Sequence, residues 1–131
     1  MGPTGFAIKA TAEDTGGQIY VAETTVEAGF PGPPPHTHQR MTDMFYVLEG
    51  TLTIHVDGEE REAGPGTFAC FPPGVVHTFA NRSDAPARFL NLSTPGGFEG
   101  YMRALADAMQ RDAFTPELIA SLAEGYDIQV V

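Results

Sequence analysis

The chain is short of cysteine and of long apolar runs, and these shortages exclude several classes of protein. Its only cysteine, Cys70, has no partner for an internal disulfide bond. No stretch is apolar over the roughly 20 residues that cross a membrane, and the first residues lack the pattern of a secretory leader. We therefore predict a protein of the reducing cytoplasm with no membrane partner. Because Cys70 lies inside the apolar stretch 67–71, we expect a small buried side chain rather than a nucleophile.

Basic residues are also scarce. Seven Lys and Arg side chains stand against 17 Asp and Glu, which gives a formal net charge of −10. Such a charge repels a polyanion at long range, so a nucleic-acid partner is not expected. No acidic run is longer than two residues, as at Glu59-Glu60, and we interpret the charge as a solvated acidic surface.

The remaining composition is typical of one globular, β-rich domain. A chain of 131 residues can bury roughly two thirds of its unfolded surface around one core. Apolar residues make up 42% of it, which is too many for a disordered chain. Eleven prolines and 15 glycines favour short strands joined by turns over long helices. We find neither a second domain nor an internal repeat, so residues 1–131 are interpreted as one domain.

Runs rich in β-branched and aromatic residues occupy the middle of the chain. Residues 1–17 have no clear period and are interpreted as an N-terminal arm with at most one edge strand. The prolines of residues 29–35 predict a stiff loop, and Asp57-Gly58 is a strong hairpin signal. The spacing of the runs predicts a sandwich or barrel over residues 18–94. The predicted strands cover residues 18–27, 43–49, 51–56, 67–71, 75–80 and 87–92.

After residue 95 the apolar residues fall three and four apart, which predicts helices over residues 95–131. Thr115 followed by Pro116 is typical of a helix start, and Gly125 can end that helix. The first helix either closes the mouth of the barrel or packs outside a sheet, and the sequence leaves both arrangements open. Its apolar face consists of Phe98, Tyr101, Met102, Leu105, Ala108 and Met109.

Three of the four histidines lie where one metal site can gather them. His36 and His38 are two residues apart, so both imidazoles point to the same face of an extended segment. His77 lies on a distant strand in phase with an apolar neighbour, where a buried imidazole needs a partner. Asp43 begins the next predicted strand, and its carboxylate can lie alongside. His55 has the opposite parity to its apolar neighbours and is predicted on the solvated face.

These residues resemble the two motifs of the cupin superfamily. The first motif is matched by His36, His38 and Gly50, with a carboxylate at Asp43 where the family normally has the longer glutamate. Beyond the motifs, residues 16–131 are similar to single-domain cupins of the quercetin dioxygenase-like type. The second motif is complete and at the family's spacing, with Gly66, Pro72, Gly74, His77 and Asn81.

The resemblance implies a fold, a cofactor and an assembly. The fold is all-β, a double-stranded β-helix or jelly-roll barrel with short C-terminal helices, and the assembly is usually a homodimer. The implied cofactor is one divalent transition metal per chain on His36, His38, His77 and Asp43. Iron, manganese or nickel is the preferred ion for these ligand types, with zinc, cobalt and copper as alternatives. Four protein ligands leave one or two positions open for a substrate.

We predict a metal-dependent dioxygenase, similar to quercetin 2,3-dioxygenase, that acts on an aromatic or polyketide-like small molecule. The substrate's hydroxyl and carbonyl oxygens bind the metal, and Asp43 is the catalytic base. An isomerase or cyclase that uses the metal as a Lewis acid is one alternative, and a non-catalytic small-molecule-binding protein is another. The predicted substrate pocket, whose members are equally suited to core packing, consists of Phe45, Phe71, Phe79 and Phe89.

Overall fold

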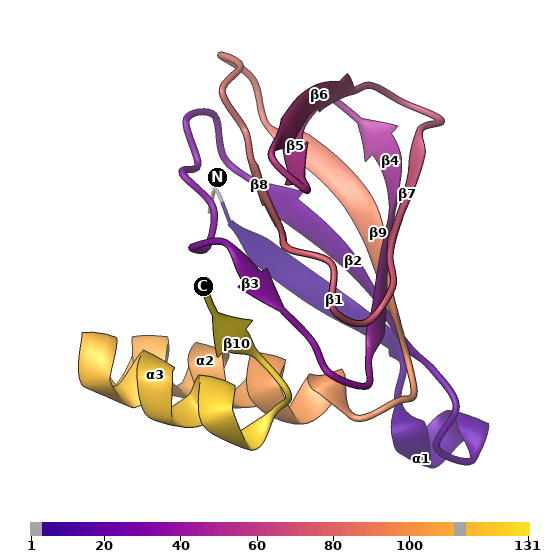
Figure 1. Ribbon diagram of the computed structural model, residues 1–131, viewed down its shortest axis with the longest axis vertical. Helices are drawn as coiled ribbons and strands as arrows, with labels where there is room; N and C mark the ends of the chain where they lie inside the picture. The colour runs from indigo at the N-terminus through magenta and orange to yellow at the C-terminus, as the bar shows by residue number, and fades with distance from the viewer. Residues whose placement is uncertain (1–3, 112–114) are drawn as a thin grey trace.

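The computed structural model describes residues 4–111 and 115–131, and two antiparallel five-stranded sheets dominate it (Figure 1). The first sheet has the strand order β1 (Gly5–Ala10), β2 (Tyr20–Val26), β9 (Ala87–Thr94), β4 (Thr42–Glu49) and β7 (Phe68–Phe71). The second has the order β10 (Gln129–Val130), β3 (His36–Thr37), β8 (His77–Ala80), β5 (Leu52–Val56) and β6 (Glu59–Ala63). From β2 to β5, and again from β6 to β9, each strand lies in the opposite sheet from the strand before it. This alternation confirms the predicted double-stranded β-helix.

The core lies between the two sheets. Along β9, buried and half-buried residues alternate, so every second side chain points into the barrel. These inward residues change from Ala87 and Phe89 to Asn91 and Ser93, which leaves one end of the barrel apolar and the other polar. The apolar cluster draws on both sheets and consists of Val26, Phe45, Val47, Leu52, Ile54, Ala63, Phe71, Ala87 and Phe89.

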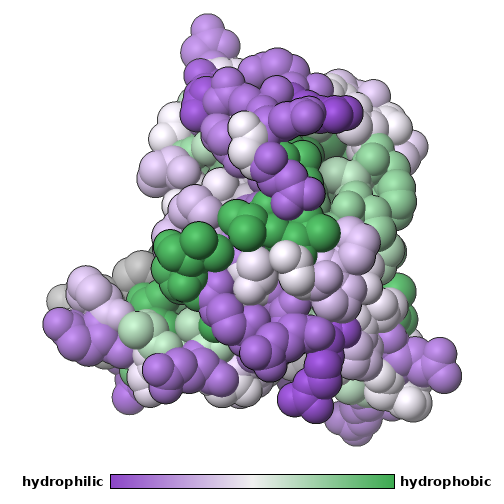
Figure 2. All heavy atoms as spheres, in the orientation of Figure 1, coloured by the Kyte–Doolittle hydropathy of each residue, from purple (hydrophilic) through white to green (hydrophobic). Residues whose placement is uncertain are grey.

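The predicted strands agree with the structure to within two residues at each end. The hairpin is also confirmed, because Asp57 and Gly58 both have positive φ, 49° and 81°. Strand β6 was not predicted, because residues 59–62 are charged and exposed. A charged edge strand blunts pairing with another chain, and Figure 2 shows a strongly hydrophilic surface around this end of the barrel.

The predicted arm, as far as the described residues reach, folds onto the first sheet. Strand β1 pairs with β2 at the edge of this sheet, which confirms one edge strand. A short helix that was not predicted, α1 (Ala12–Thr15), follows it and begins with a capping box in which Thr11 and Asp14 bond reciprocally.

The expectation that Cys70 is buried is wrong, because its thiol side chain is exposed. Strand β7 is the edge of its sheet, and its neighbour Phe71 is the residue that points inward. Cys70 has the opposite parity, so apolar neighbours in sequence did not place it in the core.

The proline-rich loop before β3 lies against β8 and fixes the point at which β3 begins. Thr78 donates a hydrogen bond to the carbonyl of Pro33, and the Asn81 backbone donates to the carbonyl of Phe30. Gly32 has a φ of 80°, and a Cβ on it would lie 1.7 Å from the carbonyl oxygen of Phe79. Only glycine allows this close approach of two backbones.

The C-terminal segment forms two helices and a short strand. Helix α2 (Phe98–Gln110) and helix α3 (Pro116–Gly125) are confirmed, as are the N-cap at Thr115 and the helix end at Gly125. Both helices lie across one end of the barrel, below the sheets in Figure 1. The ring of Phe98 packs edge-on against that of Tyr20, with ring centroids 5.5 Å apart, so α2 begins against an inward-facing residue. Met109, predicted on the apolar face, is 60% exposed.

Strand β10 was not predicted. Its two residues pair with β3, with Val130 opposite His36, and so bring the C-terminus beside the predicted metal ligands. None of the helices in residues 4–111 and 115–131 has the length and apolarity needed to cross a membrane.

We expect Gly32→Ala to lower the free energy of unfolding by about 2–4 kcal/mol, because the new Cβ meets backbone and the positive φ is strained. Gly64→Ala is the matched control, because a Cβ there has open space. Denaturant unfolding of both variants measures the difference. A Gly32→Ala protein as stable as the control would contradict this view of the loop.

Candidate metal centre

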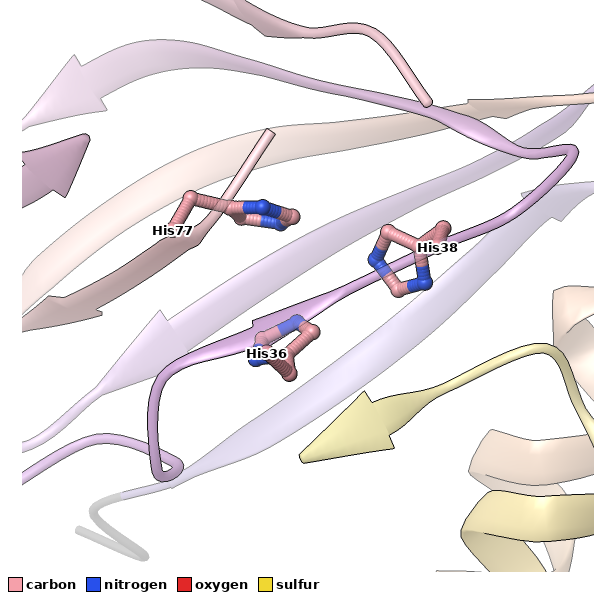
Figure 3. Close-up of side chains that lie close together, drawn as sticks. All are labelled: His36, His38 and His77. Atoms are coloured by element: carbon pink, nitrogen blue, oxygen red, sulfur yellow. The ribbon is translucent and has the colours of Figure 1, made fainter. Parts of the chain in front are cut away.

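His36 and His77 lie directly opposite each other on neighbouring strands of the second sheet. β3 pairs with β8, and His36 is the register partner of His77. His38 follows two residues after His36 on the same face, as predicted. The three ring centroids lie 4.5–5.2 Å apart, and Figure 3 shows the rings converging from the two segments. One nitrogen from each ring can be chosen so that all three lie within 4.8 Å of one another.

Backbone carbonyls orient all three imidazoles. Nδ1 of His36 lies 2.9 Å from the carbonyl oxygen of Pro34, and Nδ1 of His77 lies 3.0 Å from that of Val75. Nδ1 of His38 lies 2.8 Å from the carbonyl oxygen of Asp127. A carbonyl oxygen only accepts, so each Nδ1 carries the proton and each Nε2 keeps a lone pair. Metal-binding histidines are oriented by the same kind of contact.

The chemistry of the donor set fits a metal ion. His38 and His77 are each only 2% exposed, and their Nε2 atoms have no hydrogen-bond partner within the described part of the chain. A buried nitrogen without a partner is costly, and a cation bound to both lone pairs would remove that cost. Imidazole nitrogens are ligands that divalent transition metals favour.

The electrostatics keep His36 in its ligand form. Burial lowers the pKa of His36, and the neighbouring His77 and His38 lower it further against the opposing effect of the Pro34 carbonyl. The imidazole is therefore neutral at pH 7, with Nε2 free to bind a cation.

Asp43 borders the three histidines without joining their cluster. Its Oδ2 lies 3.4 Å from Nε2 of His77 and 3.9 Å from Nε2 of His38. Its Oδ1 accepts hydrogen bonds from Asn91, at 2.7 Å, and from Ser93, at 3.4 Å. The group of ligand atoms that lie within 4.8 Å of one another does not include this carboxylate. Direct ligation by Asp43 therefore stays a prediction.

The four phenylalanines of the predicted pocket pack on one another. The ring of Phe45 lies 4.8–5.4 Å from the rings of Phe71, Phe79 and Phe89. Phe71 also stacks on the imidazole of His77, with ring centroids 4.3 Å apart and planes 5° apart. Phe71 thus joins the apolar core to the candidate metal centre, and a role of any of the four in substrate binding stays a prediction.

His55 lies away from the other histidines, as predicted. Its Nε2 is 2.9 Å from a carboxylate oxygen of Glu60, and Arg82 contacts the same groups. It belongs to a surface charge cluster on the outer face of the second sheet.

Sequence reasoning missed a row of polar residues beside Asp43. Tyr20 is the register partner of Ser93, and Ser93 is the partner of Asp43, so the three lie side by side across β2, β9 and β4. Tyr20 is fully buried, and its hydroxyl has no hydrogen-bond partner among residues 4–111 and 115–131. Burial raises the pKa of Tyr20 well above its usual value, and the carboxylates of Glu99 and Asp43 raise it further. The phenol therefore stays a hydrogen-bond donor.

Asp127 is a second residue that sequence reasoning missed. Its backbone carbonyl orients His38, and its carboxylate accepts hydrogen bonds from the backbone N–H groups of Gln39, Arg40 and Met41 at 2.7–3.0 Å. Burial raises the pKa of the Asp127 carboxyl, but these donors outweigh it and hold the pKa below its usual value. An aspartate just after a helix carries no local signal of a partner almost ninety residues away.

The fold is a jelly-roll barrel, and three oriented imidazoles lie together inside one of its ends. The protein is therefore a small β-barrel with a candidate three-histidine metal centre. A family model described as "Cupin domain" matches residues 22–93, which is more than half of the chain. The chain belongs to the cupin family.

Individual relatives extend this comparison. Quercetin 2,3-dioxygenase from Bacillus subtilis (strain 168) is 32% identical over 110 residues, which cover 84% of this chain and 32% of that protein. The polyketide cyclase RemF from Streptomyces resistomycificus superposes with a TM-score of 0.61 at 26% identity, over 71% of this chain and 66% of that one. KdgF from Halomonas sp., at 19% identity and a TM-score of 0.65 over 76% of this chain and 86% of that one, shares the fold. The chain spans about a third of the length of the curated relatives it matches.

Replacing His36 and His77 together by alanine should abolish metal retention, because it removes the two ligands that face each other across β3 and β8. After loading with Fe²⁺, Mn²⁺ or Ni²⁺ and removal of excess ion, we expect about one ion per chain in the unmodified protein by elemental analysis. The double variant should retain almost none. His55→Ala should retain as much as the unmodified protein, and equal retention by all three proteins would contradict the assignment.

Proposed function

We propose that this cupin is a metal-dependent dioxygenase acting on a small aromatic or polyketide-like molecule with neighbouring hydroxyl and carbonyl oxygens. One observation carries the proposal. A carboxylate with one free oxygen, Oδ2 of Asp43, stands beside three imidazoles whose Nε2 atoms are free to bind a cation. The combination supplies a cation site and a proton acceptor within one buried end of the barrel.

His36, His38 and His77 are the proposed ligands. A divalent transition metal held by these three imidazoles would supply Lewis acidity and open coordination positions for substrate oxygens. Iron, manganese and nickel are the ions we propose first, since three imidazoles and a nearby carboxylate suit them.

Asp43 is the proposed general base. Asn91 and Ser93 hold Oδ1, so Oδ2 is the oxygen directed toward His77 and His38. A substrate hydroxyl bound beside these imidazoles loses its proton to Oδ2 and becomes an enolate. The ring carbon adjacent to the one that bears this oxygen is then electron-rich and can form a bond with dioxygen. The shorter aspartate side chain suffices for this role, because its free oxygen already lies 3.4 Å from the nearest ligand nitrogen.

The surroundings of the site suit a partly apolar ligand. Phe71 covers one face of His77, and the remaining phenylalanines continue the apolar surface deeper into the barrel. Tyr20, in register with Ser93 and Asp43 across the first sheet, adds a buried hydroxyl that can donate a hydrogen bond. Helix α2 and strand β10 cover the end of the barrel, which helps to keep water away from a deprotonated substrate.

The similarity to quercetin 2,3-dioxygenase over 84% of the chain supports this substrate class. The solved polyketide cyclase, at 26% identity, favours a second candidate, a metal-dependent cyclase or isomerase that needs no oxygen. A non-catalytic ligand-binding role is the third. From the resemblance and the composition we further propose a cytoplasmic homodimer.

Oxygen uptake separates these candidates. We expect metal-loaded protein mixed with 3-hydroxyflavone, which has neighbouring hydroxyl and carbonyl oxygens, to consume dioxygen in step with loss of the flavonol. Loss of a substrate under argon would instead support the cyclase or isomerase. Tight binding without turnover, in air and under argon, would support the binding protein.

Asp43→Asn should lower kcat/KM for the flavonol by about 10²–10⁴-fold, because the amide cannot accept the proton. Metal content should fall far less than in the double histidine variant, since the three histidines remain. Asp57→Asn, a change of the same type in the exposed β5–β6 turn, is the control. Equal kcat/KM in both variants would remove Asp43 from the chemistry.

A further inference from the structure

The C-terminal segment reaches across the chain to the turn that carries His38. Asp127 makes four contacts there: its carbonyl oxygen with Nδ1 of His38, and its carboxylate with the backbone N–H groups of Gln39, Arg40 and Met41. All four distances lie between 2.7 and 3.0 Å. The partners are 86–89 residues apart in sequence, so these contacts are tertiary.

The carboxylate is what places the carbonyl. Three backbone donors on one ionised side chain are charge-assisted hydrogen bonds, which are shorter and stronger than neutral ones. They fix Asp127 over residues 39–41 with its backbone at a φ of 62°. In that position its carbonyl oxygen faces Nδ1 of His38, while the carboxylate bonds to the backbone of residues 39–41.

The residues that follow Asp127 secure the other side of the site. The backbone N–H of Ile128 donates to the carbonyl of Ala123 at the end of α3, and Val130 pairs with His36. The backbone N–H of Val131 donates to the carbonyl of Pro35. Residues 127–131 therefore hold both the segment that begins at His36 and the turn that follows His38.

We propose that Asp127 is a positioning residue for the metal centre, and that docking of the C-terminal segment through Asp127 sets the orientation of His38 and hence the affinity for the metal. The proposal rests on the metal site of the proposed function and not on the reaction. Because metal binding and docking both favour one orientation of His38, each strengthens the other.

Titration with Co²⁺ tests the proposal, because this ion reports both affinity and coordination geometry through its visible spectrum. Asp127→Asn keeps the size of the side chain but removes the charge and replaces one of the two acceptor oxygens by an N–H₂ group, which faces backbone donors, so the turn is held less firmly. We expect Co²⁺ affinity, measured in competition with a chromophoric chelator, to fall about 10–100-fold. The Co²⁺ spectrum should change as His38 loses its fixed orientation.

Two further variants make the result specific. Asp127→Gly retains the carbonyl and adopts positive φ freely, so it removes the carboxylate without removing the group that contacts His38. Asp57→Asn replaces an exposed turn aspartate of similar φ, 49°, whose carboxylate bonds to none of the three histidines, and should leave affinity and spectrum unchanged. Thermal unfolding of the metal-free proteins measures any general loss of stability.

The outcomes separate this proposal from the metal site itself. If the unmodified protein binds no Co²⁺, the metal site of the proposed function fails. The second outcome is that the unmodified protein binds Co²⁺ and both Asp127 variants bind it with the same affinity and spectrum as the unmodified protein. Asp127 is then a purely structural residue and the proposal is overturned, even if the metal-free variants melt at a lower temperature.

Discussion

Three hydrogen bonds between imidazole Nδ1 atoms and backbone carbonyls are the interaction on which the site depends. Each of His36, His38 and His77 has such an oxygen within 3.0 Å of Nδ1. Because a carbonyl cannot donate, the contact selects one tautomer and leaves the Nε2 lone pair free. Without it, each buried ring would sample two tautomers and more than one orientation, and the three lone pairs would not meet.

The fold supplies these carbonyls in two ways. His36 and His77 each use the carbonyl two residues earlier in the chain, at Pro34 and Val75. Both follow proline-containing loops, in which fixed φ angles hold the backbone in place, and the β3–β8 register then brings the two rings face to face. His38 instead depends on a residue of the C-terminal segment. Its orientation is set only when that segment lies against the barrel, so the site is complete only with this long-range contact.

The features that depend on local sequence pattern were predicted from the sequence. Alternating parity placed the strands and separated His55 from the other histidines, and the spacing of the motif residues indicated the barrel. What depends on tertiary contact was missed: strand β10, the buried hydroxyl of Tyr20 and the contacts of Asp127. Cys70 shows the same limit on a smaller scale, because an apolar neighbourhood in sequence does not say which face of an edge strand a residue occupies.

The protonation of the imidazoles in metal-free protein tests the account most directly. Long-range ¹H–¹⁵N correlation NMR at neutral pH distinguishes a proton on Nδ1 from one on Nε2. We predict that His36, His38 and His77 carry the proton on Nδ1, the nitrogen that faces a backbone carbonyl. His55, whose Nε2 lies 2.9 Å from the Glu60 carboxylate, should carry a proton on Nε2. Protonated Nε2 atoms, or rapid exchange between tautomers, in the first three histidines would contradict a site organised by backbone carbonyls.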